Sequence, residues 1–271
     1  MIITNILNGI GKRLRKKTVS SNYTKISWLG EKLLKHQDDL LVKQRNFGEF
    51  TLNYIRPYEV IKTHKEIFTE EIYKFNTTAT NPVIIDCGAN IGLSTLYFSL
   101  AYSNSRVYAF EPDETLYKLL ESNITANNLS NVHLHNEAVW IENTNLSFSN
   151  KGSEASQIDT TGQSATKVKA IQLAEFLSNF ERIDFLKMDI EGAEFEVVKD
   201  CKDQLAKVQN FFLEYHGTSN ETNKLIELLE IVKKAGLKVY IKMAADNLSN
   251  PFVEQTTGTP FDVQLNIFCY K

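Results

Sequence analysis

Cysteine is scarce in this sequence, and its positions exclude two classes of small protein. The 271 residues include three cysteines, Cys87, Cys201 and Cys269, which are odd in number and lie far apart. A disulfide-rich secreted domain needs paired cysteines, and a zinc site of the Cys-x-x-Cys type needs closely spaced ones. The three thiols are therefore expected to be reduced, which favours a cytoplasmic protein.

The sequence also lacks long apolar runs and a surplus of basic charge. No run approaches the roughly 18 apolar residues needed to cross a bilayer, so no transmembrane segment is predicted. The formal net charge of −3 gives no reason to expect nucleic acid as a partner, because phosphate binding needs a basic surface. Hydrophobic residues make up 42% of the chain, as in an ordinary globular protein.

The first residues combine weak apolarity with a cluster of basic charge. Residues 1–10 are mildly apolar, and after them come five basic residues, Lys12, Arg13, Arg15, Lys16 and Lys17. A secretory signal has the opposite order, with positive charge before its apolar stretch, so this order again predicts a cytoplasmic protein. Two interpretations of the basic run stay open: a solvated stretch, or peripheral contact with an anionic membrane surface.

Two regions differ in their residue patterns, and we expect a boundary near residue 75. Residues 1–75 contain two stretches of helical periodicity, 26–41 and 57–74, and an alternating, strand-like stretch at 48–55. This α-rich region is predicted to form a cap on the main domain, either as a lid over a site or by simple packing. Residues 76–271 are predicted to form the main domain.

From residue 82 onward, short β-branched runs alternate with helical stretches, the pattern of a doubly wound α/β fold with a parallel sheet. The polar stretch 150–163 interrupts this pattern and is predicted to be a loop. The expected strands are 83–86, 106–110, 132–135, 183–188, 210–215, 237–242 and 262–270. The expected helices are 92–102, 113–127, 171–179, 193–200 and 221–235. Ligands of such sheets bind beyond the carboxyl ends of the strands, so the residues that follow each strand are the candidates for a site.

A glycine-rich turn follows the first of these strands. Its sequence is Asp-x-Gly-x-Asn-x-Gly, and we assign five of its positions to a cofactor site: Asp86, Gly88, Asn90, Gly92 and Ser94. Glycine lets a backbone approach a ligand and exposes amides at the start of a helix. The spacing differs from the Gly-x-Gly-x-x-Gly of dinucleotide sites, and a carboxylate here repels a pyrophosphate but attracts the ammonium of a methionine moiety. A plain strand-to-helix turn is the alternative.

The next two strands end on residues that suit a nucleoside. Glu111 closes the second strand about 20 positions past the glycines, where a carboxylate can accept hydrogen bonds from ribose hydroxyls. Glu137 and Ala138 follow the third strand, with Trp140 nearby, and we place them at an adenine pocket. The alternatives are a surface or capping role for Glu111 and a core position for Trp140.

Carboxylates gather where the fourth strand ends. Asp189, Glu191 and Glu194 fall within six residues, and Gly192 permits the turn into the next helix. Such a group can act as a general base, as ligands of a metal ion, or as binders of a cofactor ammonium or of acceptor hydroxyls. A solvated helix start with acidic capping is the alternative.

The fifth strand ends on a glutamate and a histidine two residues apart, Glu214 and His216. Residues at this spacing face the same side of a strand, so the two side chains are expected to meet at the sheet edge close to Asp189. An unperturbed histidine has a pKa of about 6.5 and can act as a base at neutral pH. We assign the catalytic role to His216, Glu214 and Asp189, and a structural or solvated histidine is the alternative.

Together these motifs resemble the FkbM family of methyltransferases. The resemblance rests on five stretches and covers roughly residues 55–216: the glycine turn, Phe110-Glu111-Pro112, Ala138-Val139, residues 186–194 and Glu214-x-His216. It implies a class I fold that binds S-adenosylmethionine, a seven-stranded sheet whose last strand is antiparallel, and methyl transfer to hydroxyls of sugars, glycolipids or polyketides. Met188 stands where isoleucine or valine is commoner, and the first 55 residues match no family motif.

The resemblance predicts an O-methyltransferase for a small-molecule or glycan acceptor, and it leaves a homodimer open. In-line transfer needs alignment of the acceptor oxygen, methyl carbon and sulfur, and the hydroxyl must lose its proton. His216, supported by Glu214, is the first candidate base, and the alternative is a Mg²⁺ ion held by Asp189, Glu191 and Glu214. Two rival interpretations are a nicotinamide-dependent oxidoreductase, which would need the absent dinucleotide motif, and a non-catalytic cofactor-binding subunit, which would not need the acids.

Overall fold

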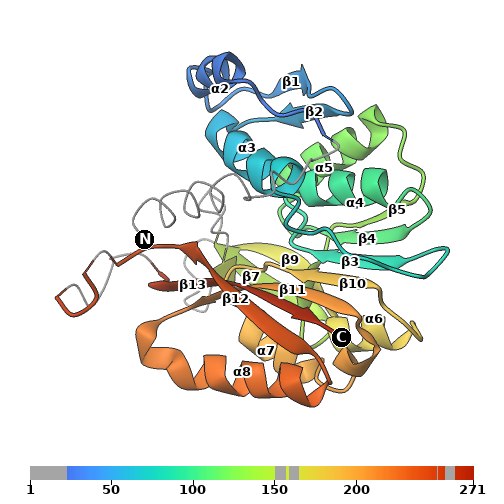
Figure 1. Ribbon diagram of the computed structural model, residues 1–271, viewed down its shortest axis with the longest axis vertical. Coiled ribbons are helices and arrows are strands. Elements are labelled where there is room, and N and C mark those ends of the chain that lie inside the picture. The colour runs from blue at the N-terminus through green and yellow to red at the C-terminus, as the bar shows by residue number, and fades with distance from the viewer. Residues whose placement is uncertain (1–22, 150–156, 159–164, 249, 254–259) are drawn as a thin grey trace, which may run out of the picture.

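A seven-stranded sheet forms the centre of the molecule (Figure 1). The computed structural model describes residues 23–149, 157–158, 165–248, 250–253 and 260–271. In spatial order the strands are β12 (Lys238–Ala245), β13 (Val263–Tyr270), β11 (Asn210–Gly217), β10 (Phe185–Met188), β3 (Val83–Cys87), β4 (Arg106–Phe110) and β5 (Val132–His135). β13 runs antiparallel to both of its neighbours, and the other adjacent pairs are parallel. The predicted class I sheet with an antiparallel last strand is confirmed.

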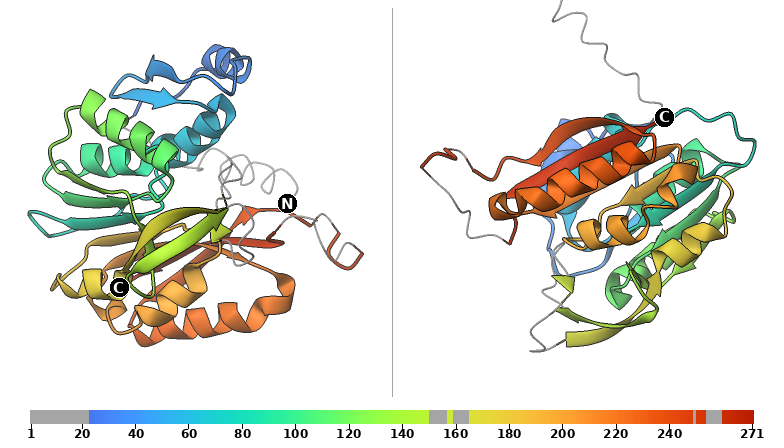
Figure 2. Two further views of the ribbon diagram at one scale, coloured as in Figure 1. Left: turned by 180° about the vertical axis from the view of Figure 1, so that it is seen from behind. Right: turned by 90° about the horizontal axis from the view of Figure 1, so that it is seen from below.

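Helices cover both faces of this sheet (Figures 1 and 2). On one face lie α3 (Pro57–His64), α4 (Leu93–Ala101) and α5 (Glu114–Ala126), and on the other lie α6 (Leu173–Ser178), α7 (Glu194–Asp200) and α8 (Thr222–Lys234). Neighbouring residues of β3 enter different cores, Ile84 on the first face and Ile85 on the second. A continuous apolar run is typical of a parallel strand that is buried on both faces. The connections change direction between β3 and β10, and a ligand crevice is expected at such a switch.

The N-terminal region adds a β-hairpin to the two expected helices. It contains α2 (Trp28–Lys35), β1 (Lys43–Asn46), β2 (Thr51–Tyr54), α3 and a π-helical turn, η1 (Lys65–Thr69). The helix expected over 26–41 ends early because the Asp38 carboxylate accepts the amides of Leu40 and Leu41, at 2.7 and 3.0 Å, and holds a turn. The helix expected over 57–74 changes to π-helical geometry after His64 and ends at Thr69.

This N-terminal region shares a hydrophobic core with the main domain. One cluster contains side chains from α2, β2, η1, α4 and α5: Leu34, Leu52, Phe68, Leu96 and Leu120. Asn123 of α5 also accepts the amide of Asn53 in β2 at 2.6 Å. The basic run at 12–17 lies outside the described residues. Within the described ranges, no helix combines the length and apolarity needed to cross a bilayer.

A second, smaller sheet was not predicted. It consists of β6 (Ala138–Trp140), β9 (Ala165–Gln172), β7 (Thr144–Ser149) and β8 (Gln157–Ile158), in that order. β8 interrupts the loop expected over 150–163, whose other residues lie outside the described ranges. The alternation of polar and apolar residues at 167–170 is the strand signal that the sequence contained. Figure 2 shows this sheet on the side of the molecule that carries α6 and α7.

A buried histidine of the N-terminal region makes stability depend on pH. The His64 side chain is 1% exposed and stacks on Phe47, Phe50 and Phe68, and its Nε2 has no hydrogen-bond partner among the described residues. Burial lowers the pKa of His64 to about 4, so the folded chain holds it neutral. In the unfolded chain, His64 has its ordinary pKa of about 6.5 and is therefore protonated at a higher pH than in the folded chain. The stabilisation is therefore complete above about pH 6.5 and is lost as the pH falls toward 4.

A fall from about pH 7.5 to pH 4.5 is expected to lower the free energy of unfolding by about 2–3 kcal/mol, because the unfolded chain then binds a proton at His64 that the folded chain does not. Urea unfolding of the wild type and of His64→Phe at both pH values measures this loss. The difference in unfolding free energy between the two chains should change by this amount from one pH to the other. The phenylalanine ring keeps the aromatic stacking and cannot titrate. A difference that stays constant with pH contradicts the expectation.

Candidate active site

The glycine-rich turn joins β3 to α4 at the carboxyl end of the sheet. Gly88 and Gly92 have φ angles of +84° and +92°, a region that glycine adopts without strain. A Cβ atom on Gly88 would lie 1.8 Å from the carbonyl oxygen of Asp189, so the turn touches the end of β10. The amides of residues 88–92 all donate hydrogen bonds within the chain. The sequence had predicted exposed amides here, but in the structure each of these amides already has a partner within the chain.

Asp86, predicted to bind the cofactor, lies beneath the turn. Its side chain is fully buried, and Oδ2 accepts hydrogen bonds from Ser94 Oγ and Thr95 Oγ1, both at 2.7 Å. These hydroxyls belong to the first turn of α4, so Asp86 fixes that helix to β3. In the structure Asp86 supports the turn from inside the fold.

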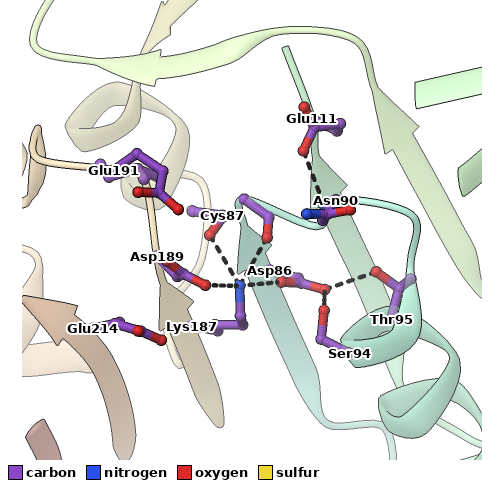
Figure 3. Close-up of polar contacts among 12 residues, drawn as sticks. Asp86, Cys87, Asn90, Ser94, Thr95, Glu111, Lys187, Asp189, Glu191 and Glu214 are labelled. Carbon is purple, nitrogen blue, oxygen red and sulfur yellow. Dashed lines mark hydrogen bonds and ion pairs between the residues drawn. The ribbon is translucent and has the colours of Figure 1, made fainter. Parts of the chain in front are cut away.

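A buried lysine that the sequence analysis did not single out lies at the centre of these contacts (Figure 3). Lys187 Nζ donates to the Gly88 carbonyl at 2.8 Å and lies 3.4 Å from Asp86 Oδ1 and 3.6 Å from Asp189 Oδ2. Burial alone would lower the pKa of Lys187, but Asp86 and then Asp189 raise it above its usual value. The charged ammonium therefore joins the ends of β3 and β10 beneath the turn.

Glu111, the predicted ribose ligand, holds the turn from the end of β4. Its Oε2 accepts the amide of Asn90 at 2.8 Å, and its Oε1 accepts the amide of Asp113 at 2.9 Å. Burial raises the pKa of Glu111 to about 7, against the effect of these two hydrogen bonds. The Glu111 side chain is 5% exposed and is not among the residues that line the cavity described below, so the structure shows it as a support of the turn.

A cavity of about 530 Å³ opens between the turn, the N-terminal region and the strand ends. The turn contributes Gly88, Asn90 and Ser94, and the strand ends contribute Lys187, Asp189 and Glu214. Charged side chains line the opposite wall, on α3 and at its two ends: Arg56, Glu59, Lys62 and Glu66. Glu66 lies in the π-helical turn η1, a geometry that is frequent at functional sites. The N-terminal region is therefore one wall of this cavity.

The residues predicted for an adenine pocket do not line this cavity. Glu137 forms an ion pair with Lys169 and lies 3.5 Å from His135 Nδ1. Ala138 is buried in β6, and Trp140 packs against the core on the α7 side of the sheet. Trp140 thus occupies the core position that was the alternative to a pocket.

A cluster of carboxylates surrounds one imidazole where β10 and β11 end. His216 Nδ1 lies 3.1 Å from Glu194 Oε1, and His216 Nε2 lies 3.8 Å from both Glu191 Oε2 and Glu214 Oε1. One ligand atom each from Asp189, Glu214 and His216 lie within 4.8 Å of one another. The three predicted catalytic residues are therefore brought together, and Glu191 lies at their edge.

Glu194 organises this cluster from inside the fold. Its side chain is fully buried, and its carboxylate accepts the amides of Ile190 and Gly192 at 3.0–3.1 Å as well as contacting His216. Gly192 has a φ angle of +100°, which lets the chain turn tightly around this carboxylate. Glu194 thus fixes both the turn after β10 and the orientation of the imidazole ring.

The clustered groups shift one another's pKa. Burial, and then the charge of Asp189, raises the pKa of Glu191 and of Glu214 to about 8. Burial alone would lower the pKa of His216, but the hydrogen bond to Glu194 and the neighbouring carboxylates raise it to about 10. The carboxylates around His216 therefore favour its protonated form while no other cation or donor is bound in the cluster.

The sequence that builds this site has counterparts among known proteins. The family described as the Methyltransferase FkbM domain matches residues 86–239, a range that contains the glycine turn, Glu111 and both strand ends. The chain belongs to the FkbM methyltransferase family. The predicted resemblance is thereby confirmed, and the chain carries a methyltransferase domain.

Three relatives of this FkbM domain are named as methyltransferases. Methyltransferase 1 of Beauveria bassiana is 28% identical over 171 residues, which cover 54% of this chain and 69% of that protein. Methyltransferase sdnD of Sordaria araneosa is 29% identical over 204 residues, 62% of this chain and 79% of that protein. The 2-O-methyltransferase NoeI of Sinorhizobium fredii is 24% identical over 197 residues, 65% of this chain and 78% of that protein.

Within the FkbM domain, the buried pair Lys187 and Asp86 could have been found from the sequence. Each is a charged residue inside an otherwise apolar strand, and buried charges need partners. The register of the sheet places the two opposite each other. By contrast, Lys62 and Glu66 reach the cavity only through the packing of the N-terminal region, and no motif marks them.

Proposed function

We propose that this chain transfers the methyl group of S-adenosylmethionine to a hydroxyl oxygen of a small or carbohydrate-like acceptor. The observation that carries the proposal is the cavity that runs from the glycine turn to the carboxylates of Asp189 and Glu214. Its volume of about 530 Å³ falls in the range of small-molecule sites, roughly 300–1,000 Å³. The name of the relative NoeI, a 2-O-methyltransferase, supports oxygen as the accepting atom.

The turn side of the cavity fits S-adenosylmethionine. Gly88 lines the cavity and packs against the Asp189 carbonyl, where a Cβ atom would clash, and the carboxylate of Asp189 suits the ammonium of a methionine moiety. Asn90 lines the cavity, and Glu111 lies behind it and accepts its amide, with lone pairs left for a ribose hydroxyl that approaches the end of β4. S-adenosylmethionine, when bound, supplies a methyl group on a positively charged sulfur.

The acceptor hydroxyl is proposed to lie against Asp189 and Glu214, the strand-end carboxylates that line the cavity. Their oxygens accept the hydroxyl hydrogen bond and direct the oxygen lone pair at the methyl carbon. A carbon–oxygen bond would form as the carbon–sulfur bond of bound S-adenosylmethionine breaks, and the hydroxyl proton would pass to one of these two carboxylates. The wall formed by α3 and η1 carries the charged groups that meet the rest of the acceptor.

Calorimetric titration with S-adenosylhomocysteine tests the cofactor. The wild type is expected to bind it with micromolar affinity and not to bind NAD, and Glu111→Gln is expected to weaken binding at least tenfold, the loss of one charge-assisted hydrogen bond, about 1.5–3 kcal/mol. Glu121→Gln, on the exposed side of α5, is the matched control and should leave the affinity unchanged. A folded wild type that binds NAD instead, or neither ligand, would refute the proposed cofactor.

A further inference from the structure

We propose that Asp189, Glu214 and His216 form a binding site for one divalent first-row transition metal ion, with Mn²⁺ as the representative. The site differs from the set that the sequence analysis named, because His216 takes the place of Glu191. Its role in catalysis rests on the proposed function, whereas the binding of the ion does not.

The first observation is the convergence of three ligand atoms from two strand ends. One atom each of Asp189, Glu214 and His216 lie within 4.8 Å of one another. Ligands at about 2.1 Å from an ion, at right angles, lie roughly 3 Å apart, so rotation of the two carboxylates would complete the site. Both carboxylates are 26% exposed and line the cavity, and therefore have room to rotate.

The second observation is the orientation of the buried histidine. The His216 side chain is 3% exposed, and its Nδ1 is held at 3.1 Å by Glu194. Its Nε2 faces the cluster, where the nearest carboxylate oxygens are 3.8 Å away and no hydrogen bond is made within the described residues. A carboxylate that fixes one ring nitrogen while the other points at clustered ligands is the usual arrangement around a metal-bound histidine.

The third observation is the crowding of acidic side chains. Asp189, Glu191, Glu194 and Glu214 surround a single imidazole, and the ammonium of Lys187 is shared between Asp189 and Asp86. A divalent cation would stabilise the ionised carboxylates of such a group. Two carboxylate oxygens suit hard ions and one imidazole nitrogen suits transition metals, which together favour Mn²⁺ or Fe²⁺ over Mg²⁺.

An ion in this position would have an open side toward the cavity, because Asp189 and Glu214 line it. An acceptor hydroxyl could complete the coordination there. A bound cation lowers the pKa of a coordinated hydroxyl and would so help the acceptor oxygen to lose its proton.

The test is titration of the full chain with MnCl₂, followed by electron paramagnetic resonance and calorimetry. We expect one ion per chain and a ¹⁴N modulation from the imidazole in pulsed spectra of the wild type. Asp189→Asn and Glu214→Gln should each weaken Mn²⁺ binding at least tenfold. Glu66→Gln, which removes a cavity carboxylate outside the three ligands, should change it less than threefold.

Three results would overturn the site: no Mn²⁺ binding to the folded wild type, bound Mn²⁺ without nitrogen modulation, or an equal loss of affinity in Glu191→Gln and Glu214→Gln. The nitrogen signal needs no histidine variant, so it does not depend on a substitution that might unfold the chain. Titration of the same samples with S-adenosylhomocysteine separates the two proposals. If the chain binds Mn²⁺ but not S-adenosylhomocysteine, the proposed function is refuted and the metal site stands. If it binds S-adenosylhomocysteine but not Mn²⁺, the metal site is refuted and the proposed function stands.

Discussion

Replacing Lys187 by methionine is expected to lower the free energy of unfolding by about 3–5 kcal/mol, because it leaves the fully buried carboxylate of Asp86 without its cation. The carbonyl of Gly88 also loses its donor, so the glycine turn loses its link to β10. Binding of S-adenosylhomocysteine should fall at least tenfold even at temperatures where the variant is folded. Urea unfolding and calorimetry measure the two effects.

The double variant Asp86→Asn/Lys187→Met separates charge from packing. It removes both buried charges, and an asparagine can still accept hydrogen bonds from Ser94 and Thr95. Stability should therefore recover to within about 2 kcal/mol of the wild type, while cofactor affinity stays low, because the ammonium that positions Gly88 is still missing. Lys167→Met, at an exposed position of β9, is the matched control. Its unfolding free energy should stay within about 0.5 kcal/mol of the wild-type value. A Lys187→Met chain as stable as this control would show that the buried pair contributes little.

Replacing Gly88 by alanine is expected to be at least as damaging to the site. A Cβ atom there would lie 1.8 Å from the Asp189 carbonyl oxygen, and the φ angle of +84° adds backbone strain. The turn and the end of β10 must separate, which moves Asp189 and opens the cavity floor. We expect a loss of more than about 3 kcal/mol in unfolding free energy and no detectable binding of S-adenosylhomocysteine.

Gly236→Ala provides a control with the same backbone strain and no collision. Gly236 has a φ angle of +82°, and a Cβ atom there would meet nothing within 4 Å. Its cost should be that of the left-handed conformation alone, about 1–2 kcal/mol, with cofactor binding unchanged. If Gly88→Ala and Gly236→Ala lose the same unfolding free energy, the close contact between Gly88 and β10 does not contribute to stability.

The main domain was largely readable from the sequence because its elements are local patterns. Apolar runs such as Val83-Ile84-Ile85 mark strands that are buried on both faces. The start of α5 was equally clear, since Asp113 accepts the amides of Thr115 and Leu116 as a helix N-cap. The small sheet was missed although residues 167–170 alternate, because its strands follow a short β6 and flank a polar stretch that suggested only a loop.

The sequence by itself determined the order of the strands and helices of the main sheet, the glycine turn and the acidic residues at the strand ends, since each depends on residues that are close together in the chain. Only the tertiary structure decided what those residues do. Asp86 turned inward to Lys187, four acidic side chains met around His216 and raised its pKa, and α3 became a wall of the cavity. These outcomes depend on burial and on charges from different strands, because a pKa or a partner is set by what surrounds a group in space.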